Sequence, residues 1–264
     1  MKFYRYWSES KHHIRVAGRD KEIRLLTGSA VSEQDALREA EQQARLIEQR
    51  IASGEEKQQY ETAIKEFISE QLDDQNVVSV CRYGAKILNS SQYTFYDIDH
   101  VRYGLFDFFK GLHKLTPKQR MARRFTDVAK KFPQLGTDFR IYETAKGIRV
   151  IGRQYLDPTA ASSARIMARL NVDWLYTQLS RKQQCYRARL TPKPFRMKIK
   201  TIRVRSPLMC QTDEYRQWDD MYRQAASRYA VVNFVEAIGR DFAQEPVIRY
   251  HDDCCQAHSQ LKLA

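Results

Sequence analysis

The order of apolar and polar positions in residues 1–75 predicts two strands followed by two helices. Strand-like runs cover Lys2–Trp7 and Ile23–Thr27. Ser32 then begins a helix, because Asp35 stands three positions later as in a capping box and apolar residues recur at helical spacing after it. The second helix is expected from one apolar face, formed by Tyr60, Ile64, Phe67 and Ile68. We therefore expect an N-terminal β-β-α-α extension.

Residues 76–206 predict a core in which strands and helices alternate. Val77–Cys81 and Ala85–Leu88 are typical of a hairpin turned at Tyr83-Gly84. The elements expected after this hairpin are, in order, a strand, a helix, two strands, a helical region and two strands: Tyr93–Asp99, 116–132, Phe139–Thr144, Ile148–Tyr155, 162–183, Tyr186–Leu190 and Met197–Val204. From Tyr93 onward the β-α-β-β-α-β order is that of the ferredoxin-like fold, which includes RRM-like RNA-binding modules and polymerase palms. We therefore expect an α+β fold.

Residues 207–264 predict a C-terminal helical extension packed on the core. One helix is expected to begin near Thr212, and a short strand is expected at Val247–Tyr250. No flexible linker separates the three segments, so we expect one compact body.

The charge pattern indicates a polyanionic partner. The chain has 45 Lys and Arg against 32 Asp and Glu, a formal net charge of +13. No acid occurs between Asp173 and Asp213, whereas that stretch carries Arg181, Lys182, Arg187, Arg189, Lys193, Arg196, Lys198, Lys200, Arg203 and Arg205. A surface of one sign attracts polyanions, of which nucleic acid is the commonest. An acidic protein or anionic lipid is the alternative, and solubility alone is the simplest explanation.

Other classes of protein are disfavoured. No apolar run reaches the length of a membrane span, roughly 20 residues. The first residues lack the apolar core of a signal peptide, so we expect a cytoplasmic protein with no membrane partner. The 5 cysteines include no CxxC pair, so neither a zinc site nor a disulfide framework is expected.

Asp97 and Asp99 are the candidate catalytic and metal-binding residues. In a strand, residues two apart point to one face, so both carboxylates would project together. Such a pair repels unless a cation lies between its members, and Mg²⁺ or Mn²⁺ is the usual cation. His100 could assist. The alternative is that the acids end a strand, with one exposed and the other paired to an arginine.

A second motif lies at the expected hairpin tip. Lys146 and Gly147 would let backbone N–H groups approach a phosphate closely, and Arg149 could reach the same anion. Glu143 might then complete the metal ligands as a third carboxylate. The alternative is an ordinary hairpin with a Lys-Gly turn.

A third motif supplies further phosphate-binding residues. Arg187 and Arg189 alternate along a strand and share one face, where they would clamp a triphosphate or a backbone phosphate. The two prolines that flank Lys193 fix the path of the chain that presents this residue, and Arg196 is a further phosphate-binding candidate just after it. The alternative is that these arginines pair with Asp97, Asp99 or Glu143. Tyrosines near the acids could stack on bases if their rings are exposed: Tyr93, Tyr96 and Tyr103.

These motifs together resemble a family of uncharacterised bacterial proteins. The likeness covers most of the chain and rests on the Phe95–Asp99 run, the Arg140–Arg149 run and the string Arg-Ala-Arg-Leu-Thr-Pro-Lys-Pro at 187–194. That family brings no activity with it. The chain is also distantly similar to archaeo-eukaryotic-type primases and primase-polymerases. This likeness implies metal binding at the two aspartates and nucleotide binding at the hairpin, where Arg149 stands in place of the expected histidine.

Three functions follow as hypotheses. The first is a metal-dependent nucleotidyltransferase of primase type, which would use nucleotide triphosphates and nucleic acid. The second is a non-catalytic nucleic-acid-binding protein on the same fold. The third is a basic adaptor for an acidic protein.

Overall fold

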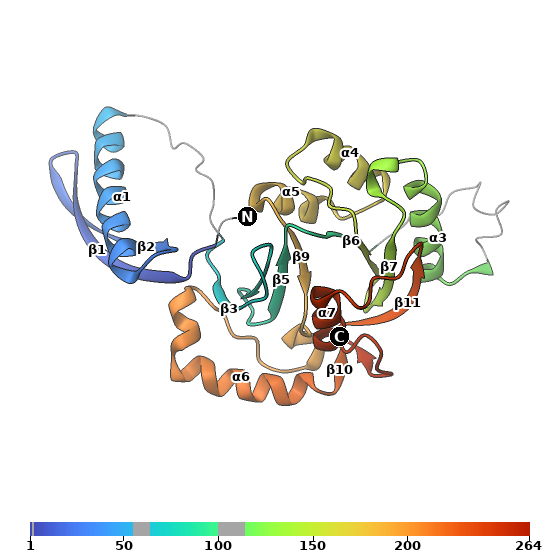
Figure 1. The fold of residues 1–264 in the computed structure, drawn as a ribbon. Helices are drawn as coiled ribbons and strands as arrows, with labels where there is room; N and C mark the ends of the chain where they lie inside the picture. Colours follow the sequence, from blue (N-terminus) through green and yellow to red (C-terminus); the bar gives the residue numbers. More distant parts are fainter. Residues whose placement is uncertain (2, 55–63, 100–113) are drawn as a thin grey trace.

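The computed structural model describes residues 1, 3–54, 64–99 and 114–264, and begins with a long hairpin (Figure 1). Strands β1 (Tyr6–Val16) and β2 (Arg19–Ser29) pair antiparallel along their whole length. Helix α1 (Glu33–Ser53) packs on this hairpin, capped by the Ser32 side chain, which accepts a hydrogen bond from the Asp35 amide. The Ser32 cap is confirmed, but the capping box is not, because the Asp35 carboxylate accepts from the Ser29 hydroxyl at 2.7 Å. The first strand lies later in the chain than expected, because the alternating run pairs with β2 from Tyr6 onward.

A four-stranded antiparallel sheet follows, in the order β3-β4-β5-β9. Its strands are β3 (Phe67–Gln71), β4 (Asn76–Val80), β5 (Lys86–Ser90) and β9 (Tyr186–Arg189). The expected helix around Phe67 and Ile68 is wrong, because these residues pair with β4 instead. Tyr60 lies outside the described residues. The hairpin of β4 and β5 is confirmed, with Gly84 in the left-handed region at its turn.

The second four-stranded antiparallel sheet has the order β11-β7-β8-β6. Its strands are β6 (Thr94–Ile98), β7 (Phe139–Thr144), β8 (Ile148–Gly152) and β11 (Val232–Ile238). Helix α3 (Pro117–Ala129) covers one face, where the Phe125 ring packs edge-on against Tyr96 and Phe139. Helix α7 (Pro246–Cys255) lies against the other face through His251, whose ring meets Tyr142. Both helices flank this sheet in Figure 1.

The α+β class is confirmed, and the element order from β6 to β9 follows the sequence pattern. The helical region between β8 and β9 forms two helices, α4 (Ala161–Arg169) and α5 (Trp174–Gln183). In a ferredoxin-like fold the last strand would pair beside the first. Here β9 forms its hydrogen bonds with β5 in the other sheet, so the strand pairing does not establish that arrangement.

The region after β9 departs most from expectation. No strand forms over Met197–Val204; the 3₁₀ turn η3 (Pro194–Met197) is followed by a segment without regular secondary structure, outside both sheets. After the 3₁₀ turn η4 (Pro207–Gln211), helix α6 (Asp213–Ala226) begins at the Thr212 cap as expected.

The last part of the chain adds both a helix and strands. The expected strand at Val247–Tyr250 is wrong, because Pro246 begins α7 there. Strand β11, which the sequence pattern did not predict, extends the β7 edge of the core sheet. Strands β10 (Tyr229–Ala230) and β12 (Lys262–Leu263) form a short parallel pair. The C-terminal segment is thus part of the core sheet as well as a helical cover.

Candidate anion-binding site

Asp97 and Arg149 lie opposite each other on β6 and β8 and form an ion pair. The distance from Arg149 Nε to Asp97 Oδ1 is 3.0 Å, and only 3% of the Arg149 side chain is exposed. Arg149 also donates to the Arg189 carbonyl at 2.9 Å. Burial opposes the charge of Arg149, but Asp97 nevertheless raises its pKa above the ordinary value. Arg149 therefore joins β6, β8 and β9 from inside, and does not face solvent as a phosphate-binding residue would.

A buried polar network continues from Arg149 beneath α7. Arg140 donates to the Tyr142 hydroxyl at 2.7 Å and pairs with Asp252 at 2.8 Å. His251 Nδ1 lies 2.9 Å from Asp252 Oδ1, and its Nε2 lies 3.3 Å from Arg149. Burial lowers the pKa of His251, and the neighbouring arginines add to this effect. Because each charged group here already has a partner, the network fastens α7 to the sheet.

The carboxylates do not assemble into a three-acid site. Glu143 alternates with Tyr142 on β7 and so points to the opposite face from Asp97, where it pairs with Lys118 of α3 at 3.4 Å. Asp99 is exposed just beyond β6. In the described part of the chain, no three His, Cys, Asp or Glu side chains are placed to hold a metal ion. His100 lies outside the described residues.

Arg187 pairs with a partner that the sequence pattern did not reveal. Its guanidinium lies 2.5 Å from Glu66, which also accepts a hydrogen bond from Ser79 at 2.6 Å. Glu66 precedes β3 and reaches Arg187 only because β3, β4, β5 and β9 form one sheet. Arg187 is thus held on the sheet and does not combine with Asp97.

Lys193 is close enough to three other cations, Lys146, Arg189 and Arg196, for their charges to affect its pKa. We call these four residues the cationic cluster. Burial lowers the pKa of Lys193, and the charges of the other three lower it further, whereas Asp99 acts in the opposite direction. Burial also lowers the pKa of Arg189, with Arg149 and Arg196 adding to the effect. Within the described ranges, no ion pair of the four with an Asp or Glu is found, but Arg189 donates to the Ala264 main-chain oxygen at 3.4 Å.

The cluster is held by close backbone packing on one side. Gly147 lies at the β7–β8 tip, where a Cβ atom would come 2.0 Å from the Ile98 carbonyl and 2.8 Å from Asp99 Cα. Only glycine allows this approach. The tip therefore carries Lys146 beside the end of β6, and the expected hairpin with a Lys-Gly turn is confirmed.

Helix α6 holds the other side of the cluster. The Tyr222 hydroxyl lies 2.7 Å from both the Thr191 hydroxyl and the Pro192 carbonyl, and Thr191 in turn accepts from the Lys86 amide at 2.9 Å. These contacts fix the loop that carries Lys193. Beside it, the Phe195 ring is 63% exposed and lies 5.9 Å from Lys193 Nζ.

The described tyrosines that were expected to stack on bases are buried, unlike Phe195. Tyr93 and Tyr96 are buried, at 2% and 0% exposed, so neither presents a ring to a base. Tyr103 lies outside the described residues. Phe195 is thus an exposed ring next to Lys193, and the sequence pattern did not single it out.

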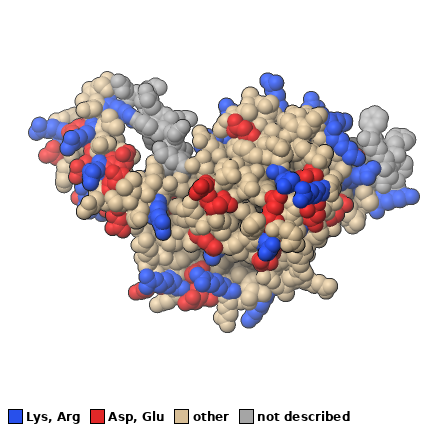
Figure 2. All heavy atoms as spheres, viewed as in Figure 1, with Lys and Arg blue, Asp and Glu red and all other residues tan. Residues whose placement is uncertain are grey.

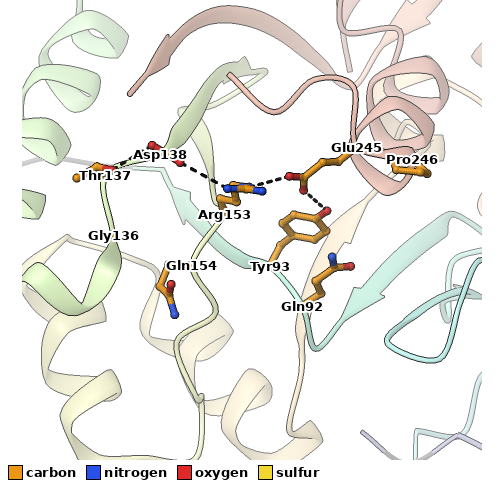
Figure 3. Close-up of a pocket in the computed structure, with 9 residues that line it drawn as sticks. All are labelled: Gln92, Tyr93, Gly136, Thr137, Asp138, Arg153, Gln154, Glu245 and Pro246. Carbon is orange, nitrogen blue, oxygen red and sulfur yellow. Dashed lines mark hydrogen bonds and ion pairs between the residues drawn. The ribbon is translucent and has the colours of Figure 1, made fainter. Parts of the chain in front are cut away.

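A separate cavity of about 500 Å³ lies at the opposite end of β6 (Figure 3). Arg153 stands between Glu245, at 2.7 Å, and Asp138, at 3.9 Å. The Tyr93 hydroxyl donates to Glu245 at 2.5 Å. These lining groups partner one another, and none of the residues that the sequence singled out for phosphate or metal binding lines the cavity.

Surface charge elsewhere is mixed. On the face shown in Figure 2, basic and acidic side chains are interspersed, so the net charge alone does not mark a binding surface. None of the described helices has the length and apolarity needed to cross a bilayer. Comparison with models of known protein families, with curated proteins and with solved structures found no match.

Proposed function

We propose that the protein binds nucleic acid and that the cationic cluster contacts the phosphate backbone. One observation carries the proposal: Lys146, Arg189, Lys193 and Arg196 meet from three segments of chain without a pairing carboxylate in the described residues. Like charges held together repel, and a bound phosphate relieves that repulsion while accepting charge-assisted hydrogen bonds. The element order shared with RRM-like modules is consistent with this function.

Metal-dependent nucleotidyl transfer of primase type is the second candidate. Its support is the position of Asp99, which is exposed and close enough to Lys193 to influence its pKa. The residues fit Mg²⁺ or Mn²⁺ poorly, because Asp97 is paired with Arg149 and Glu143 with Lys118. Two carboxylates, one of them already paired, are fewer than a two-metal site requires. We therefore rank binding above catalysis.

The test measures binding of a fluorescent oligonucleotide by anisotropy over a series of salt concentrations. Each phosphate contact contributes about 0.9 to the slope of log affinity against log salt for duplex, and about 0.7 for a single strand. Replacing Arg189, Lys193 and Arg196 with Gln should lower the slope by about 2 to 3 and the affinity by at least tenfold. The matched control replaces Arg165, Arg181 and Lys182, which are exposed and outside the cluster.

The control should bind almost as the unaltered chain does, because its altered charges lie elsewhere. Equal losses in the two triple variants would show that only net charge matters, and would remove the cluster from the function. Stronger binding to poly-glutamate than to the oligonucleotide would favour the adaptor hypothesis. Mn²⁺-dependent nucleotide incorporation that Asp99→Asn abolishes, with oligonucleotide affinity retained, would promote the second candidate above the first.

A further inference from the structure

The segment from Lys198 to Arg205 follows the cationic cluster and joins none of the described sheets. Its apolar side chains Ile202 and Val204 are buried at 7% and 6% exposure. Its basic side chains are exposed: Lys198, Lys200, Arg203 and Arg205. We call these four residues the basic segment. Burial alternates only from Thr201 to Arg205, because Lys198 lies in a left-handed turn and Lys200 and Thr201 are both exposed.

Two hydrogen bonds and one close packing contact hold this segment in place. The Trp218 indole of α6 donates to the Lys200 carbonyl at 2.8 Å, and the Val204 amide donates to the Arg82 carbonyl at 2.8 Å. Gly84 leaves room for Trp218 and Ile202, since a Cβ there would lie 2.2 Å from the indole. The exposed charges therefore project from an anchored backbone.

The charge of this segment is not neutralised locally. Among the described residues, none of the four forms an ion pair, and two acids of the neighbouring α6 pair within their own helix, Asp213 with Arg216 and Asp219 with Arg223. Four exposed cations on one anchored stretch of chain create a positive potential there. The stretch begins two residues after Arg196 of the cationic cluster.

We infer that the basic segment is a second backbone-contacting surface, along which a nucleic-acid strand continues from the cationic cluster. This inference rests on the proposed function. Seven residue steps at about 3.3 Å would reach at most about 23 Å, the length of about 7 nucleotides at 3.4 Å each. A mononucleotide would cover only part of this segment. A polynucleotide offers regular charges of one sign over that length, whereas the surfaces of folded proteins usually intersperse both signs.

The test compares oligothymidylates of about 4 and about 20 nucleotides, because only the longer one can occupy the cluster and the segment together. The variant replaces Lys198, Lys200, Arg203 and Arg205 with Gln. The matched control replaces Lys130, Lys131, Arg165 and Arg169, which are exposed on or near α3 and α4. The expected result is a loss of at least tenfold in affinity for the long oligomer and about twofold or less for the short one, with a salt slope reduced by up to about 3.

Circular dichroism establishes that both quadruple variants remain folded. If the segment variant binds the long oligomer as the unaltered chain does, while the cluster variant is impaired, the inference fails and the proposed function stands. If the unaltered chain binds neither oligomer, the proposed function itself fails. Equal losses of affinity for the long oligomer in the segment variant and the matched control would also overturn the inference. It would likewise be overturned if the segment variant lost as much affinity for poly-glutamate as for the long oligomer, because the partner would then be an acidic protein.

Discussion

Basic residues in neighbouring motifs have different roles, which their partners decide. Arg149 is buried against Asp97, and Arg187 pairs with Glu66. Arg189 and Lys193 come from the same motif as Arg187 but have no acidic partner in the described ranges. Partial burial without an acidic partner disfavours the charged form, which is why both have lowered pKa values. Arg189 already donates to the Ala264 main-chain oxygen at 3.4 Å, so Lys193 is the more available of the two to an anionic ligand.

Gly147→Ala tests the close approach at the hairpin tip. The added methyl group would meet the Ile98 carbonyl at 2.0 Å, so the tip must move away from β6. We expect the free energy of unfolding to fall by about 1–3 kcal/mol, measured by denaturant titration. Lys146→Ala at the adjacent exposed position is the control, with an expected change within about 0.5 kcal/mol. An unchanged midpoint for Gly147→Ala would mean that the tip does not pack as described.

His251 should make stability depend on pH. Its pKa is lowered in the folded chain by burial, so the unfolded chain, with a histidine pKa of about 6.5, binds the proton more readily. The contribution of His251 to the free energy of unfolding is therefore fully present above about pH 6.5. It decreases as the pH falls below that value, by at most about 1.4 kcal/mol per pH unit. The decrease ends once the pH is below the pKa of His251 in the folded chain.

The measurement is the free energy of unfolding at several pH values between about 5 and 7. His251→Gln should remove most of the slope, whereas His13→Gln, on the exposed hairpin, should keep it. Asp252 has a lowered pKa, so its own contribution is lost only at more acidic pH, below the ordinary aspartate value of 3.8. A slope that persists in His251→Gln would assign it to another group.

At the scale of elements, the segment after η3 explains why a strand was expected there. From Thr201 to Arg205 its side chains alternate between exposed and buried like those of a strand. The main chain nevertheless bonds to single groups on other elements, Trp218 and Arg82, and not to a neighbouring strand. Alternation reports which side of the chain is buried, and it does not report what the backbone pairs with.

Tyr222→Phe tests whether α6 positions the loop that carries Lys193. Removing the hydroxyl deletes its 2.7 Å contacts with Thr191 and Pro192. We expect a loss of about 1 kcal/mol in the free energy of unfolding and a several-fold loss of oligonucleotide affinity. Tyr229→Phe is the matched control, because its hydroxyl has no hydrogen bond to another described residue. Unchanged affinity in Tyr222→Phe would show that the loop holds Lys193 without α6.

At the scale of the whole molecule, the two sheets and the C-terminal segment depend on one another. The larger apolar core includes Val78 and Leu88 of one sheet together with Phe95 and Val150 of the other. From the C-terminal segment, β11 pairs with β7, and α7 buries the arginines of the polar network. The segment therefore completes the core.

Deleting residues 207–264 should abolish cooperative folding. The deletion would expose the β7 edge and leave Arg140 without Asp241 and Asp252. Removing one partner of a buried pair is strongly destabilising, by about 3–5 kcal/mol, and two partners would be lost together. Thermal unfolding followed by near-ultraviolet circular dichroism checks this against the full chain. A single sharp transition in the shortened chain would show that the segment is an appendage.

Local signals in the sequence determined the elements that depend on neighbouring residues. The Ser32 cap of α1, the Thr116 cap of α3 and the Gly84 turn of the β4–β5 hairpin act within a few positions, so their patterns predicted them correctly. Tertiary structure alone decided which charges are neutralised. Glu66 and Arg187 are 121 positions apart, and Asp97 and Arg149 are 52 apart. Such pairs form only when sheets bring distant strands together, because ionic attraction depends on distance in space, and no local pattern records that distance.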